Sequence, residues 1–266
     1  MLVGTGAAGA YGEVIWWRAA AALTVAAALQ VGVNYANDYS DGVRGADIGR
    51  VGPYRLVASG IASPASVRAA AVGAFAVAAV AGLALAAAAG WWLLGVGFAC
   101  VAAAWLYTGG PRPYGYVGLG EVFVFAFFGL VATVGTAYVQ THHFTALEVV
   151  AAVPVGLMAV SLLVVNNLRD IGTDAAAGKR TLAVRLGAPR TRLLYVLCVG
   201  LALAMVVPLG LQRSWAFLAL LASPAAAVPA RAVARGVEGP ALVPALGATG
   251  QAQLAMGVLL ALGLAL

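Results

Sequence analysis

Two short windows hold most of the carboxylates in this chain. The first, VGVNYANDYSDGVRGAD, covers residues 31–47, and the second, VVNNLRDIGTDAAAGKRTLAVRLG, covers residues 164–187. Each window lies at the end of a long apolar run, and each repeats a spacing in which asparagine precedes aspartate by four residues. Five of the nine acidic residues lie in them: Asp38, Asp41, Asp47, Asp170 and Asp174.

The spacing in each window places the polar side chains on one face of a helix, because residues four apart are neighbours on a helical surface. In the first window this face holds Asn34, Asn37, Asp38 and Asp41. In the second it holds Asn166, Asp170 and Asp174. Both windows end apolar spans on the same side, so we expect them to face each other across a cavity of a helical bundle.

Carboxylates gathered in this way repel one another unless a cation lies between them. Carboxylate and asparagine oxygens are hard ligands that suit Mg²⁺, which keeps coordination positions for phosphate oxygens. Cations that would bind an anionic diphosphate follow the two windows: Arg50, Arg55, Lys179, Arg180 and Arg185. The pattern predicts a magnesium-bound diphosphate site. The alternative is that these aspartates are solvated loop charges paired with nearby arginines.

The rest of the chain indicates what must position these residues. It is 63% apolar and 9% charged, whereas a soluble domain is about half apolar and about a quarter charged. Long apolar runs recur along all 266 residues, which predicts an all-α, polytopic transmembrane bundle. The net charge of +6 comes from arginines in short loops, so nucleic acid is not the expected partner.

We expect one domain, residues 1–266, with eight full spans and a truncated first helix. The predicted spans are 14–36, 64–88, 91–107, 117–139, 145–167, 190–211, 214–234 and 244–266. Residues 1–10 are apolar but too short to cross a hydrocarbon core of about 30 Å, so we interpret them as the remnant of a first helix. The motif-bearing loops are predicted at 37–63 and 168–189. Ser63 and the Thr145–Glu148 pair are expected to cap helices.

The cations predict how the bundle is oriented. If the loop after residue 36 is cytoplasmic, only Arg18 and Arg213 of the 15 cations fall on the opposite side, as the positive-inside rule requires. The outer ends of the spans carry a set of tryptophans, as an interfacial belt would: Trp16, Trp17, Trp91, Trp92 and Trp215. We therefore expect a multi-pass protein of the cell membrane with its polar site on the cytoplasmic face.

These features resemble the UbiA superfamily of intramembrane aromatic prenyltransferases, whose two Asp-rich motifs bind Mg²⁺ and an isoprenyl diphosphate. NDYSD at 37–41 is similar to the first motif and DIGTD at 170–174 to the second. NYANDYSDGVRGAD, RVGPYRLVASG, YTGGPRPYGYVGLGE and NNLRDIGTDAAAGKRTLAVRLG resemble the branch that prenylates 1,4-dihydroxy-2-naphthoate and makes demethylmenaquinone. The family has nine helices, so the resemblance implies a misassigned start or a truncated form here.

The resemblance also implies roles for individual residues. The expected Mg²⁺ ligands are Asn37, Asp38, Asp41, Asp170 and Asp174. Asp47 is a sixth candidate, although the family's third aspartate corresponds here to Gly45. Lys179 and Arg180 would stabilise the leaving diphosphate. Contacts to the polyprenyl diphosphate or to the 1,4-dihydroxy-2-naphthoate are expected from Asn34, Arg50, Arg55, Tyr107, Arg112, Tyr116, Asn166 and Asn167.

Several alternatives stay open at this point. Another acceptor of the superfamily, such as 4-hydroxybenzoate, homogentisate, chlorophyllide, haem or a sugar phosphate, is possible. A transporter is a second class, but it would place acids near the bilayer midplane and not at helix ends. Glu121 is either a general base or a favourable charge at a helix N-terminus. Tyr107, Tyr114 and Tyr116 either flank the acceptor or form an ordinary interfacial aromatic cluster.

Overall fold

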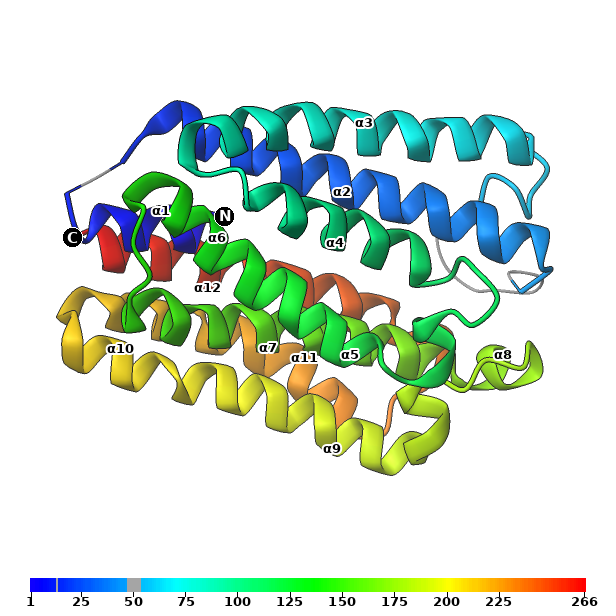
Figure 1. Ribbon diagram of the computed structural model, residues 1–266. Coiled ribbons are helices and arrows are strands. Elements are labelled where there is room, and N and C mark those ends of the chain that lie inside the picture. The colour runs from blue at the N-terminus through cyan, green and yellow to red at the C-terminus, as the bar shows by residue number, and fades with distance from the viewer. Residues whose placement is uncertain (13, 47–53) are drawn as a thin grey trace.

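The computed structural model describes residues 1–12, 14–46 and 54–266. Every regular element in these residues is helical (Figure 1). In chain order the elements are α1 (Leu2–Gly9), α2 (Trp16–Val43), α3 (Pro64–Ala89), α4 (Leu93–Leu106), η1 (Tyr114–Val117), α5 (Gly120–Val124), the π-helix η2 (Phe125–Val131), α6 (Ala132–Thr141), α7 (Ala146–Arg169), α8 (Ile171–Ala176), α9 (Leu182–Ala204), α10 (Val206–Gln212), η3 (Ser214–Ala222), α11 (Ser223–Ala234), η4 (Gly239–Leu242) and α12 (Val243–Ala265).

Seven helices of the described chain are long and apolar enough to cross a membrane. Several are built from consecutive elements, so that α5, η2 and α6 form one span over Gly120–Thr141. The span expected at 91–107 is the shorter helix α4, whose 14 residues extend about 21 Å. Its length is limited because a turn at Gly90–Trp92 precedes it and another turn follows Leu106. The predicted all-α membrane bundle is confirmed.

Helix α7 is the centre of the bundle. Buried residues make up 61% of its most apolar stretch, against 17–39% in the other six membrane-length helices. It packs closely against the π-helix η2 because a glycine lies on each side, where a Cβ added to Gly129 would come within 2.6 Å of the Cα of Gly156. The central position of α7 fixes the place of the second acidic window, which lies at its C-terminal end.

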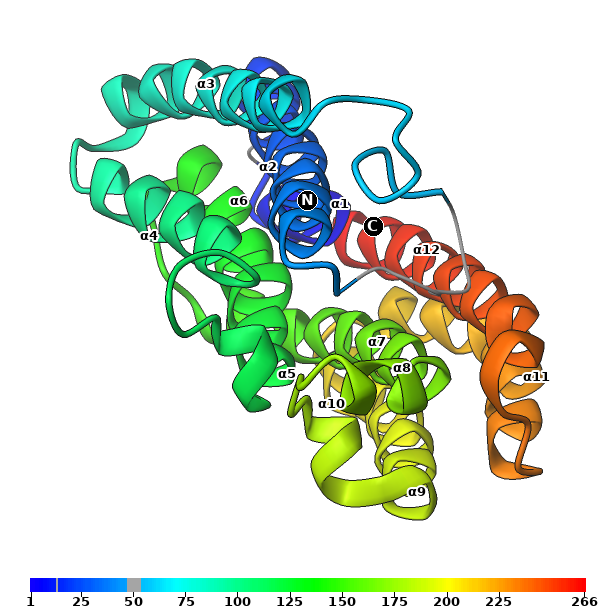
Figure 2. The ribbon, with the colours of Figure 1, turned by 90° about the vertical axis from the view of Figure 1, so that its right-hand side faces the viewer.

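Both acidic windows lie at one end of the bundle, which we call the site end (Figures 1 and 2). Helix α2 continues to Val43, so the first motif occupies its last turns and the loop predicted to begin at residue 37 begins later. Apolar runs alone placed that boundary too early, because the polar residues of the motif remain helical. Helix α7 ends at Arg169, directly before Asp170.

The opposite end of the bundle carries the tryptophans and the cap of α7. The five tryptophans named above are exposed there, at the start of α2, in the turn between α3 and α4, and at the start of η3. The predicted capping box of Thr145 and Glu148 is confirmed. The guanidinium of Arg18 donates hydrogen bonds to the carbonyls of Ala88 at 3.3 Å and Val139 at 2.8 Å, near the ends of α3 and α6.

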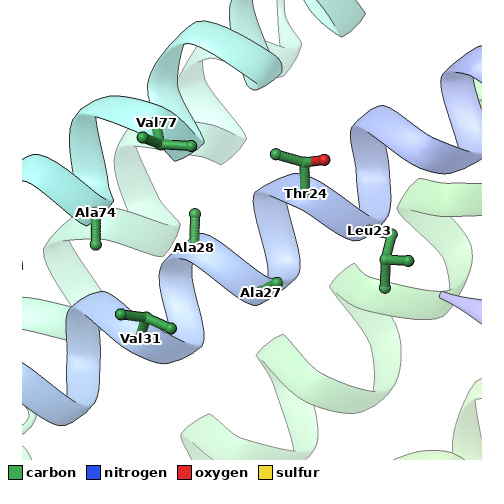
Figure 3. A pocket seen from close by; sticks show the side chains of 7 residues that line it. All are labelled: Leu23, Thr24, Ala27, Ala28, Val31, Ala74 and Val77. Carbon is green, nitrogen blue, oxygen red and sulfur yellow. The ribbon is translucent and has the colours of Figure 1, made fainter.

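A shallow apolar groove of about 470 Å³ lies between α2 and α3, away from both acidic windows (Figure 3). It is lined by Leu23, Thr24, Ala27, Ala28, Val31, Ala74 and Val77. The small side chains leave space between the two helices, as is common where membrane helices approach closely. The groove ends at Val31, seven residues before Asp38 on the same helix.

Candidate active site

Lys179 joins the two acidic windows. Its Nζ lies 2.9 Å from Oδ2 of Asp41 and 3.9 Å from Oδ1 of Asp174. The lysine follows Gly178, which has φ +74° and so allows the chain to turn back after α8. Lys179 is 9% exposed, and its ammonium group therefore interacts with these carboxylates in a largely water-excluded setting.

Tyr116 is the second group that holds Asp41. Its hydroxyl donates a hydrogen bond of 2.6 Å to Oδ1 of Asp41, and the Lys179 ammonium lies 4.8 Å from its ring centroid. Burial, and then the hydrogen bond and charge of Asp41, raise the pKa of the Tyr116 hydroxyl above its ordinary value. The phenol therefore stays protonated and acts as a donor. Its main-chain carbonyl accepts a 2.8 Å hydrogen bond from the N–H of Arg180.

Arg44, at the end of α2, holds the loop that carries Tyr116. Its guanidinium donates hydrogen bonds to the carbonyls of Thr108 and Gly110 and lies 5.6 Å from the Tyr116 ring centroid. The Thr108 hydroxyl in turn donates a 2.8 Å hydrogen bond to Oδ1 of Asn37. The loop between α4 and α5 is thereby attached to the last turns of α2.

Asp38 holds the segment that follows the first window. Its carboxylate accepts hydrogen bonds from the main-chain N–H groups of Leu56 at 2.9 Å and Val57 at 3.1 Å. The aspartate is 4% exposed. Arg55, a predicted substrate contact, directly precedes Leu56, so this interaction places it beside the first window.

In the second window, Arg169 binds both oxygens of Asp170. Its Nε donates to Oδ1 at 2.7 Å and its Nη2 donates to Oδ2 at 2.6 Å, in a bidentate pair that is largely buried. Nη2 also donates to Oδ1 of Asn166 at 2.9 Å. The sequence did not predict Arg169 as a site residue. Its position directly before Asp170, three residues after Asn166, is the signal that could have identified it.

Glu121 lies beside the second window, in the first turn of α5. It is 7% exposed, and its Oε1 accepts a 3.0 Å hydrogen bond from Nδ2 of Asn167. Its Oε2 is buried and has no hydrogen-bond partner in the described chain. Burial raises the pKa of the nearby Tyr107 hydroxyl, and the negative charge of Glu121 raises it further, followed by Tyr114, Asp174 and Asp41. Through its contact with Asn167, Glu121 therefore lies next to the second window.

Not every predicted site residue lies with this cluster. Asn34 shares the face of α2, but it is exposed and its Nδ2 donates to the carbonyl of Gln30 in its own helix at 2.7 Å. The side chains of Arg112 and Arg180 are exposed, and within the described residues no hydrogen bond or ion pair holds either of them. Asp47 and Arg50 lie outside the described residues.

The oxygen ligands gathered at the site end suit a hard divalent cation in their chemistry. In the described part of the chain, however, no three acidic, histidine or cysteine side chains are close enough to hold a metal ion. Asp41 and Asp174 instead share the ammonium group of Lys179. The residue types fit Mg²⁺, and a cationic group already lies between an aspartate of each window.

The fold and the site define a class of polytopic helical membrane protein in which two Asn–Asp windows meet at one end of the bundle. The model of the UbiA prenyltransferase family matches residues 1–241. The chain therefore belongs to the UbiA prenyltransferase family.

Relatives in other organisms share most of the chain. It is 49% identical over 265 residues to a 1,4-dihydroxy-2-naphthoate octaprenyltransferase from Mycobacterium tuberculosis, an alignment that covers 100% of this chain and 91% of that protein. It is 36% identical to the protein of the same name from Escherichia coli, with coverage of 94% and 86%. A solved UbiA homologue from Archaeoglobus fulgidus, bound to GPP and Mg²⁺, has the same fold, with a TM-score of 0.64 at 14% identity and coverage of 97% and 94%.

Proposed function

We propose that this chain transfers a polyprenyl group from a polyprenyl diphosphate to 1,4-dihydroxy-2-naphthoate, with loss of carbon dioxide. The observation that carries the proposal is the contact of Lys179 with Asp41 at 2.9 Å and Asp174 at 3.9 Å. It unites the two Asp-rich windows of a prenyltransferase-family chain in one site. The acceptor is supported by the Mycobacterium tuberculosis relative, whose name states it and which is 49% identical along the whole chain.

The two windows would bind the diphosphate together with Mg²⁺. The proposed ligands are Asn37, Asp38, Asp41, Asp170 and Asp174, with Asp47 as an additional candidate. Bound Mg²⁺ would neutralise the diphosphate charge, and the Archaeoglobus fulgidus homologue solved with GPP and Mg²⁺ supports this assignment. Lys179 is already placed among these carboxylates, so it would stabilise negative charge as it develops on the leaving diphosphate. Arg180, which follows it, would bind the diphosphate from the exposed side.

The reaction replaces one bond of the donor and one of the acceptor. The bond between the allylic carbon and the diphosphate oxygen breaks, and its electron pair leaves with the diphosphate. The ring carbon that bears the carboxylate forms the new carbon–carbon bond. Carbon dioxide then departs, and the electron pair of its bond restores the aromatic ring, which gives demethylmenaquinol.

The donor's tail explains why this site lies at the end of a membrane bundle. Each buried methylene contributes about 0.8 kcal/mol, so a polyprenyl tail stays in the apolar phase while its diphosphate reaches the carboxylates. The groove between α2 and α3 offers an apolar surface for that tail. The lining residue closest in sequence to the first window is Val31, about 10 Å along α2 from Asp38.

The acceptor would lie on the side of the cluster formed by the loop between α4 and α5. Tyr107 and Tyr116 contribute aromatic rings there, and the exposed Arg112 on the same loop would pair with the acceptor's carboxylate. Further substrate contacts are proposed for Asn34, Arg50, Arg55, Asn166 and Asn167. The cations at the site end support a cytoplasmic orientation in the cell membrane.

The experiment supplies the purified chain in bilayer discs with a polyprenyl diphosphate, Mg²⁺ and one acceptor at a time. We expect diphosphate release and a decarboxylated, prenylated product with 1,4-dihydroxy-2-naphthoate, and no product after Mg²⁺ is chelated. Asp41→Asn and Asp170→Asn are the site controls. Product formation with 4-hydroxybenzoate, homogentisate or another acceptor but not with 1,4-dihydroxy-2-naphthoate would refute the proposed acceptor. Undiminished turnover in both variants would refute the site.

A further inference from the structure

Glu121 is a buried carboxylate with an unused oxygen. One oxygen accepts the hydrogen bond from Asn167, whereas Oε2 has no partner and is closed off from solvent. In the described part of the chain no lysine or arginine forms an ion pair with it. A buried carboxylate is costly without compensation, so its retention indicates a functional role.

The surroundings of Glu121 indicate what kind of molecule would use this oxygen. Tyr107 and Tyr114 meet edge to face with ring centroids 5.4 Å apart, and Tyr114 stacks on Phe123 at 4.0 Å. The Tyr107 ring lies against the start of α5, since a Cβ added to Gly120 would come within 3.3 Å of it. Glu121 shares helix α5 with Phe123 and contacts Asn167 of the second window, so a flat, hydroxylated aromatic molecule bound against these rings would lie beside the carboxylate.

We propose that Glu121 accepts the proton of the ring hydroxyl next to the carboxylated carbon of the aromatic acceptor, and later returns it. This inference rests on the proposed function. As the ring carbon forms its bond to the allylic carbon, the hydroxyl proton moves to Oε2 of Glu121 and the C–O bond becomes a carbonyl. The product of this step is a β-keto acid, because the carbonyl is adjacent to the carbon that carries the carboxylate.

The second half of the reaction returns the proton. The bond to the carboxylate breaks, carbon dioxide leaves, and the electron pair of that bond forms the enolate of the neighbouring carbonyl. The enolate oxygen takes the proton back from Glu121, which restores the aromatic diol and the free carboxylate. No proton is gained or lost overall, so the closed position of Oε2 suits a group that must keep a proton between two steps.

Asn167 makes the proposal testable because it separates a structural role from a chemical one. Its Nδ2 donates to Oε1, and a glutamine at position 121 would accept the same hydrogen bond with its amide oxygen. If Glu121 only positions Asn167, Glu121→Gln should retain most activity. If Glu121 accepts a proton, the same variant loses at least about 100-fold in kcat, since glutamine cannot be protonated under these conditions.

The experiment compares the wild-type chain with Glu121→Gln, Glu121→Asp and Glu238→Gln in bilayer discs, with farnesyl diphosphate, Mg²⁺ and 1,4-dihydroxy-2-naphthoate. We expect Glu121→Gln to lose at least about 100-fold in kcat with an unchanged KM for the donor. Glu121→Asp should recover part of the activity, because it keeps a carboxylate. Glu238 is 72% exposed in its side chain, and its variant should match the wild type.

A second measurement guards against a folding defect in Glu121→Gln. Farnesyl thiodiphosphate with Mg²⁺ should raise the thermal unfolding midpoint of the variant as much as that of the wild type. Activity within threefold of the wild type, or loss of this thermal shift together with activity, would overturn the assignment of Glu121. Failure of the proposed function is distinguishable, because the wild-type chain would then prenylate a different hydroxylated acceptor, and the same variants would test Glu121 with that acceptor.

Discussion

The two acidic windows are held in different ways. In the first window, Asp38 and Asp41 are bound by groups from distant parts of the chain, namely the N–H groups after residue 55, Tyr116 and Lys179. In the second window, Asp170 is bound on both oxygens by Arg169, its immediate neighbour. The first window is therefore assembled by the tertiary fold, whereas much of the second is assembled within a few residues.

The difference shows which contacts decide the alignment of the site. Arg169 and Asp170 are adjacent in the sequence at the end of α7, so their pair does not depend on how the other helices pack. Lys179 instead reaches Asp41 across 138 positions of sequence, so its contact depends on how α8 and α9 pack near α2. We expect changes at this shared contact to affect activity most, and removal of the Arg169 side chain to affect stability most.

The largest expected effect comes from the aspartates that share Lys179. Asp41→Asn or Asp174→Asn should each lower kcat/KM by about 1,000-fold, because each removes a charge proposed to bind the Mg²⁺–diphosphate complex. The measurement is steady-state prenylation of 1,4-dihydroxy-2-naphthoate, with Glu238→Gln as the matched carboxylate-to-amide control. Turnover within tenfold of the wild type in either variant would contradict the proposed ligand set.

A smaller loss is expected when the shared cation itself is removed. Lys179→Met should lower kcat by about 100-fold, because a preplaced positive charge near the leaving diphosphate is lost. Asp41 would keep its hydrogen bond from Tyr116. The thermal unfolding midpoint of Lys179→Met should therefore fall less than that of Arg169→Met. An unchanged kcat would show that Lys179 serves only to hold the windows together.

The local pair should report on stability. Arg169→Met removes the two hydrogen bonds that Arg169 donates to the buried carboxylate of Asp170, and we expect a loss of about 2 kcal/mol in the free energy of unfolding. The measurement is unfolding in detergent solution. Arg192→Met is the matched control, because its partner Glu238 is exposed and such pairs contribute about 0–1 kcal/mol. Equal losses in the two variants would contradict the structural role assigned to Arg169.

The smallest effect is expected from a single hydroxyl group. Tyr116→Phe removes one hydrogen bond to Asp41 and should destabilise the chain by about 1 kcal/mol, together with a several-fold drop in kcat/KM. Tyr195→Phe is its control, because that hydroxyl is hydrogen-bonded to Thr249 at 2.6 Å between α9 and α12. We expect a similar loss of stability without a loss of activity. A drop in activity in Tyr195→Phe but not in Tyr116→Phe would contradict the role assigned to Tyr116 in the site.

The sequence predicted features that depend on neighbours along the chain. The helical bundle follows from apolar runs of membrane length, and the cap of Thr145 by Glu148 follows from a spacing of three residues. The position of both windows at one end follows from the number of spans between them. Even the shared helix face of Asn37, Asp38 and Asp41 is confirmed, because α2 continues to Val43.

Contacts between distant segments could not be predicted in this way. Arg44 binds the loop at Thr108 and Gly110, but nothing near Arg44 in the sequence distinguishes it from other loop arginines. Asn34 shows the same limit, because its spacing predicts a site residue, whereas the hydrogen bond that its amide donates to the carbonyl of Gln30 in its own helix could not be predicted. Helical periodicity predicts on which face of a helix a side chain lies. Its hydrogen-bond partner also depends on the rotamer of that side chain and on the neighbouring helix.

Arg18, at the end opposite the site, has a consequence for biosynthesis. Its hydrogen bonds to the carbonyls of Ala88 and Val139 span 70 and 121 positions of sequence, and these carbonyls lie in the last turns of α3 and α6, where helices leave such groups unpaired. A ribosome delivers residue 18 long before residue 139. The arginine must therefore wait for its second partner, and this end of the bundle becomes complete only after α6 has entered the membrane.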